Sequence, residues 1–167
     1  MKLHAGYVVV LWGLGAHAVA GNSALTPQQT HELVQQYARS QGLCSTHGAG
    51  SKIANEECPR VAEYEKKLTA AGLNPGEALS RLFDGCRRYS SAYMLASISR
   101  DNRQPPASAL AQLKAEKWLK VDEKTLKSVV NTTYFEPWAL ALPSQQLTRA
   151  VDYDCRYGPD PRWQPLK

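Results

Sequence analysis

The sequence predicts a small all-α domain: a single-domain helical bundle of about five to six helices stapled by two disulfides. Apolar residues recur at steps of three and four along most of the chain, which is the spacing of one helix face. No strand pattern of alternating β-branched residues occurs after the first 20 residues. The four cysteines form an even set behind an export signal, which is typical of disulfides formed in an oxidising compartment.

Residues 1–20 have the pattern of a signal peptide. Lys2 supplies a positive start, residues 7–14 are apolar, and Ala18-Val19-Ala20 is a small-x-small cleavage site. The apolar run is shorter than the roughly 20 residues that span a bilayer, and no other stretch approaches that length. We therefore expect a periplasmic or secreted protein with no transmembrane segment after cleavage, the alternative being a retained N-terminal anchor. The helical domain then covers residues 21–156.

Two helices are predicted before residue 72. Thr26, Pro27 and Gln29 form a capping box that opens the first, and Gly42 is expected to end it. The second covers Ile53 to Ala71, but Pro59 belongs in a first turn, which predicts that its regular part begins near Cys58. The expected buried residues of the pair are Leu33, Val34, Tyr37, Ala38, Val61, Tyr64, Leu68 and Ala71.

The longest predicted helix is the centre of the bundle. Asn74 is its expected N-cap and Pro75 its first residue, and the apolar stripe runs from Leu79 to Arg100. Gly85 leaves two possibilities open, one continuous helix or two helices that meet there, because glycine costs about 1 kcal/mol in a helix interior. The inward positions are Leu79, Leu82, Phe83, Cys86, Tyr89, Ser90, Tyr93 and Ser97.

Three further helices complete the domain. They cover Ala107 to Leu119, a segment capped by Asp122 that runs to Tyr134, and Leu142 to Arg156. Residues 157–167 contain three prolines and are predicted to form an extended tail.

The cysteines Cys44, Cys58, Cys86 and Cys155 can pair in three ways. We favour Cys44 with Cys58, which flank one loop, and Cys86 with Cys155, which lie on two core-facing stripes. A zinc site would need short paired spacings and partner histidines, and the sequence has neither. The sequence predicts no cofactor and no metal.

Charge gives little support to a polyanion-binding function. The mature chain carries about +4, and its local runs, Lys66-Lys67 and Arg87-Arg88, are less dense than nucleic-acid or membrane-surface binding requires. We therefore expect no nucleic-acid partner.

Exposed aromatics are the best candidates for a partner-binding surface. The segment containing Tyr134, Phe135 and Trp138 is broken by Pro137, and Trp163 lies in the tail. Either group can instead pack on the domain. The sequence thus favours a binding protein whose partner is another protein of the envelope or secreted space, such as an exported enzyme that it inhibits or neutralises, or an envelope assembly of which it is an accessory part.

The alternative function is a small secreted hydrolase. It would use His47 or His31 with an acid and a nucleophile such as Ser45. Cys44 is a weaker nucleophile candidate, because a catalytic cysteine must stay a free thiolate and this one has a disulfide partner nearby.

Overall fold

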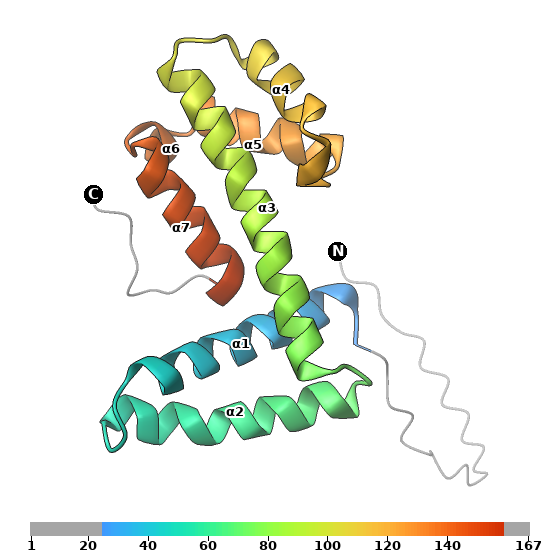
Figure 1. Ribbon diagram of the computed structural model, residues 1–167, viewed down its shortest axis with the longest axis vertical. Coiled ribbons are helices and arrows are strands. Elements are labelled where there is room, and N and C mark those ends of the chain that lie inside the picture. The colour runs from blue at the N-terminus through green and yellow to red at the C-terminus, as the bar shows by residue number, and fades with distance from the viewer. Residues whose placement is uncertain (1–24, 159–167) are drawn as a thin grey trace, which may run out of the picture.

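Seven α-helices and one 3-10 turn make up residues 25–158, the part of the chain described by this computed structural model (Figure 1). The all-α class is confirmed. The break at Pro137 adds a short helix, α6, to those expected from the sequence. In chain order the elements are α1 (Pro27–Thr46), α2 (Lys52–Ala70), α3 (Pro75–Asp101), α4 (Pro106–Ala115), η1 (Lys117–Leu119), α5 (Glu123–Phe135), α6 (Pro137–Leu140) and α7 (Ser144–Tyr157).

The termini mark the limits of this description. The predicted signal peptide, residues 1–20, and Trp163 lie outside the described residues. Within them, no helix has the length and apolar character needed to cross a membrane. Tyr157, predicted as the first residue of the tail, is instead the last residue of α7, where its backbone oxygen accepts hydrogen bonds from Arg39 of α1.

The long helix α3 is the axis of the fold. It is continuous over 27 residues, and the Asn74 side chain caps its start by accepting from the backbone N–H of Glu77 at 3.0 Å. In the view of Figure 1, α7 lies along one side of α3 and α4 lies on the other. The possible break at Gly85 does not occur, because buried residues on both sides of it pack into the core and hold one helix axis.

Replacing Gly85 with alanine is expected to stabilise the protein by about 0.5 to 1 kcal/mol, because alanine loses less backbone entropy in a helix. A Cβ added at Gly85 would meet no heavy atom within 4 Å, so no packing cost opposes the gain. Urea unfolding measures the change. Gly72→Ala is the control with the opposite sign, since Gly72 has a φ of +76° and alanine is strained there. A loss of stability in Gly85→Ala would contradict the prediction.

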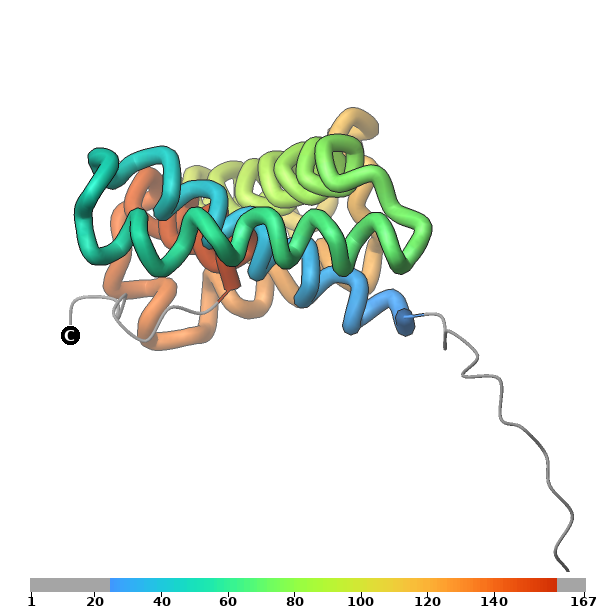
Figure 2. Tube along the Cα trace, turned by 90° about the horizontal axis from the view of Figure 1, so that it is seen from below, coloured from blue at the N-terminus to red at the C-terminus, as the bar shows by residue number. Residues whose placement is uncertain are grey.

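The α1–α2 hairpin forms a separate layer across one end of α3 and α7 (Figure 1). Seen from below in Figure 2, the two helices run side by side, and α1 lies between α2 and the rest of the domain. The hairpin encloses one apolar cluster, with Leu68 and Cys86 at its centre. A second cluster, around Ala96, Val129 and Leu147, fills the space among α3, α4, α5, α6 and α7.

Both predicted disulfides are confirmed. Cys44 near the end of α1 is joined to Cys58 of α2, and Cys86 of α3 is joined to Cys155 of α7. The first bond closes the hairpin, and the second ties α3 to the last turn of α7. Among the described residues no cysteine is free.

The predicted range of the second helix, Ile53 to Ala71, matches α2 to within one residue at each end, but the end of the first helix and the regular start of the second were predicted wrongly. α1 does not end at Gly42 but continues to Thr46, because the Ser45 and Thr46 hydroxyls both donate to the Gly42 oxygen and the backbone N–H of His47 closes the last turn. α2 does not begin near Cys58.

The start of α2 is set by a cap that lies seven residues upstream of Cys58. The Ser51 hydroxyl accepts from the backbone N–H of Ala54 at 3.1 Å, so Pro59 lies inside the helix. A proline there removes the hydrogen bond to the Asn55 oxygen. The adjacent disulfide of Cys58 and the packing of α2 along α1 hold this segment helical.

Candidate functional site

Three large apolar side chains are exposed where α5 turns into α6. Phe135, Trp138 and Leu140 have 63%, 40% and 50% of their surface accessible, and we call them the aromatic corner. α5 stops at Phe135 because Glu136 is extended and Pro137, at the first position of α6, has no N–H to continue the helix. The side chains therefore project from a tight turn between two helices.

Arg100 of α3 holds the backbone beneath the aromatic corner. Its guanidinium donates to the oxygens of Thr133, Ala139 and Leu142 at 3.4, 2.9 and 3.2 Å. These three oxygens belong to the end of α5, to α6 and to the segment before α7. Only 12% of the Arg100 side chain is exposed, so one largely buried cation fixes all three segments.

Asp101 completes this anchor. Its carboxylate accepts from Arg100 at 2.8 Å and from the Ser144 hydroxyl at the start of α7 at 2.6 Å. Burial alone would raise the pKa of Asp101, but these hydrogen bonds and the charge of Arg100 outweigh it and lower the pKa below its usual value. The ionised carboxylate thus links α3 to α7.

Of the four aromatic residues predicted to bind a partner, Phe135 and Trp138 are exposed in the corner. Tyr134 is half-buried, packs on the core and donates its hydroxyl to the Gln104 oxygen at 3.0 Å. Burial is the main cause of its raised pKa. Tyr134 therefore supports the turn from inside, while Trp163 lies outside the described residues.

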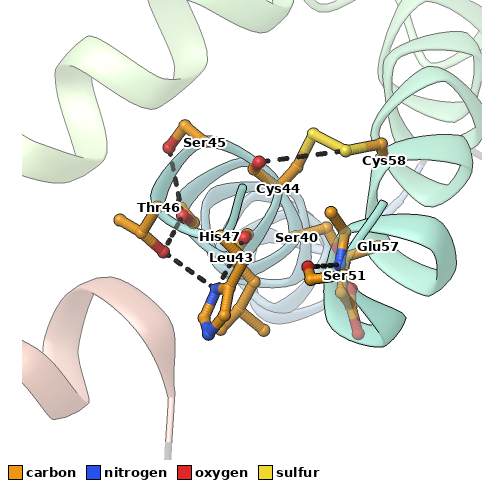
Figure 3. Close-up of a disulfide and its surroundings, with 11 residues drawn as sticks. Ser40, Leu43, Cys44, Ser45, Thr46, His47, Ser51, Glu57 and Cys58 are labelled. Atoms are coloured by element: carbon orange, nitrogen blue, oxygen red, sulfur yellow. Dashed lines mark hydrogen bonds between the residues drawn. A yellow bond between two sulfur atoms is a disulfide. The ribbon is translucent and has the colours of Figure 1, made fainter. Parts of the chain in front are cut away.

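The histidines proposed for a hydrolase lie far apart. His31 is exposed on α1, and His47 caps the other end of the same helix, about 24 Å along the axis at 1.5 Å per residue. In Figure 3 the His47 ring lies against the end of α1, where its Nδ1 is 3.0 Å from the Leu43 oxygen. The Ser45 hydroxyl donates to the Gly42 oxygen at 3.0 Å.

These contacts satisfy the terminal carbonyls of α1 and bring no acid, base and nucleophile together. Cys44 is bonded to Cys58 and is not a thiolate. Within residues 25–158, no group of three His, Cys, Asp or Glu side chains is arranged to hold a metal ion.

A concentration of lysines between α4 and α5 was not predicted as a site from the sequence. Five of the ten lysines in the chain occur within residues 114–127, at steps of three and four. The regular spacing of these lysines, at steps of three and four residues, could have indicated a positively charged surface from the sequence. However, the segment is interrupted by η1 and a loop, so its lysines do not form one helix face, and only the fold shows that Lys114 and Lys127 meet at Glu123.

No family model, curated protein or solved structure matches this chain.

Proposed function

We propose that this protein is an exported binding protein of the periplasm or secreted space and that it holds another protein at the aromatic corner. The observation that most directly supports this proposal is that Phe135 and Trp138 are exposed on a backbone fixed by the largely buried Arg100. Large apolar side chains stay exposed at a cost in water, and burial against a partner recovers that free energy.

Rigidity is the second argument for binding. Aromatic anchors contribute most to affinity when the free protein already holds them in the bound geometry, because little conformational entropy is then lost. Four partly buried hydrogen bonds fix the turn between α5 and α6. Arg100 donates three of them and Tyr134 donates the fourth. A partner with an apolar pocket would find Phe135 and Trp138 already in place.

The disulfides and the predicted signal peptide support the proposed compartment. Two disulfides persist only where thiols are not kept reduced, and the periplasm and the secreted space satisfy this condition. In such a compartment the partner would be an exported enzyme that this protein inhibits or neutralises, or an envelope assembly of which it is an accessory part.

Site-specific photocrosslinking in the producing cells tests the proposal. A benzophenone amino acid in place of Phe135 is expected to yield one discrete adduct with a protein of the envelope or secreted fraction. The same amino acid in place of Ile98, which is 44% exposed on α3, is the matched control and is expected to yield no such adduct.

The additional substitution Trp138→Asp should abolish the adduct at position 135, because it places a charge inside the apolar contact. Equal crosslinking from positions 135 and 98, or an adduct that Trp138→Asp does not reduce, would contradict binding at the aromatic corner.

A further inference from the structure

The ends of α4 and α5 carry an excess of positive charge. Residues 114–127 contain five lysines, three carboxylates and no arginine. All five lysines are exposed: Lys114, Lys117, Lys120, Lys124 and Lys127. The nearest arginines in the sequence are Arg103 and Arg149.

Glu123 joins the two helix ends. Its carboxylate lies 3.0 Å from Lys114 of α4 and 3.0 Å from Lys127 of α5. One carboxylate therefore serves two ammonium groups and leaves the trio with a net positive charge.

The other two carboxylates of the stretch are also engaged locally. Asp122 caps α5 by accepting from the backbone N–H and the hydroxyl of Thr125 at 2.9 and 2.6 Å. Glu116 accepts from the indole N–H of Trp118 at 2.6 Å. Lys117, Lys120 and Lys124 have no ion pair with any residue that the structure describes.

Trp118 lies between Lys117 and Lys120 in the sequence and is half exposed. The following residue, Leu119, is 1% exposed and packs into the larger apolar cluster, which holds η1 against the domain. The indole N–H of Trp118 is bonded to Glu116, and half of the surface of Trp118 is accessible to solvent. We call Lys117, Trp118, Lys120 and Lys124 the lysine surface.

We propose that the lysine surface binds anionic phospholipid headgroups and places the protein on a membrane as a peripheral protein. Lysines act as flexible point charges suited to a layer of many phosphates, whereas arginine is preferred for paired contacts with single phosphates or bases. Tryptophan partitions to the boundary between headgroups and acyl chains, and its ring would enter that boundary while the lysines neutralise the surface charge. This inference is independent of the aromatic corner.

Vesicle co-sedimentation of the exported, oxidised protein tests the inference. Vesicles with 30% phosphatidylglycerol in phosphatidylcholine are compared with pure phosphatidylcholine at low and physiological salt. The triple variant Lys117→Gln, Lys120→Gln, Lys124→Gln is expected to bind the anionic vesicles about a hundredfold more weakly, since each lysine near an anionic surface contributes roughly fivefold.

A charge-matched control separates the lysine surface from net charge. Lys52→Gln, Lys66→Gln, Arg149→Gln removes three exposed cations elsewhere and should weaken binding by less than about threefold. Circular dichroism of both variants should show unchanged helicity. Trp118→Phe should remove the component of the tryptophan fluorescence that shifts to the blue when anionic vesicles are added.

Three results would overturn the inference. Both triple variants could lose binding equally, which would reflect net charge alone. Vesicle binding could be independent of phosphatidylglycerol. The protein could leave vesicles unbound and bind an anionic polysaccharide or DNA through the same three lysines, which would assign the lysine surface to a different partner.

Discussion

The double substitution Cys86→Ala, Cys155→Ala is expected to reduce the free energy of unfolding by about 4.4 kcal/mol, as chain entropy predicts for a loop of 69 residues. The double substitution Cys44→Ala, Cys58→Ala opens a loop of 14 residues, for which the same relation gives about 3 kcal/mol. Denaturant unfolding at equal protein concentration measures both values.

The burial of Cys86 should make the two double variants differ further in their free energy of unfolding. Cys86 is 1% exposed at the centre of the smaller apolar cluster, so its loss also removes packing where α1 meets α3 and α7. Cys44 and Cys58 are only half-buried at the edge of the hairpin. A larger loss from the Cys44 and Cys58 pair would show that the hairpin, and not the α3–α7 contact, depends most on its crosslink.

Arg100→Met is expected to destabilise the protein by about 3 kcal/mol, because methionine fills the space of the stem but donates no hydrogen bond. The oxygens of Thr133, Ala139 and Leu142 would each lose a charged donor in a poorly hydrated site. Thermal unfolding should show a fall of roughly 10 °C for a domain of this size. Arg100→Lys should recover only part of the loss, since an ammonium group cannot span three oxygens.

Arg87→Met is the matched control on the same helix. Arg87 forms an ion pair with Asp84, three residues earlier, and its side chain is 70% exposed, so the cost should stay within about 0.5 kcal/mol. Arg100→Met should also abolish the crosslink from position 135, because the aromatic corner loses the anchor that fixes it. An unchanged melting temperature for Arg100→Met would contradict the role given to this residue.

The features predicted correctly are those encoded over a few residues. The Thr26 capping box, the Asn74 cap and the Asp122 cap all form as expected, because each depends on a side chain and a backbone N–H three residues away. Leu147 and Val151 are buried on the stripe that carries Cys155, which is why the disulfide with Cys86 could be favoured from periodicity.

The features predicted wrongly or missed depend on contacts between distant segments. Pro59 was assigned to a first turn by a local rule, but the disulfide and packing against α1 hold it in a helix interior. Arg100 is the last residue of the predicted apolar stripe, and nothing near it in the sequence indicates a structural role. The backbone oxygens to which it donates lie 33 to 42 residues further along the chain. Tyr134 and Phe135 are adjacent in sequence, and only the position of α5 in the fold decides that one is half-buried and the other exposed.

The order of the disulfides along the chain has a consequence for biogenesis. Each cysteine is bonded to the next partner in sequence, Cys44 to Cys58 and Cys86 to Cys155, so the two loops follow one another without overlap. An oxidase that joins thiols as they emerge, N-terminus first, would make both native bonds without a later isomerisation step. If the chain is exported as it is synthesised, the Cys86 thiol waits for 69 further residues, which takes roughly 3 to 14 s at synthesis rates of about 5–20 residues per second. The α1–α2 hairpin, already closed by its own bond, can pack over Cys86 during that interval.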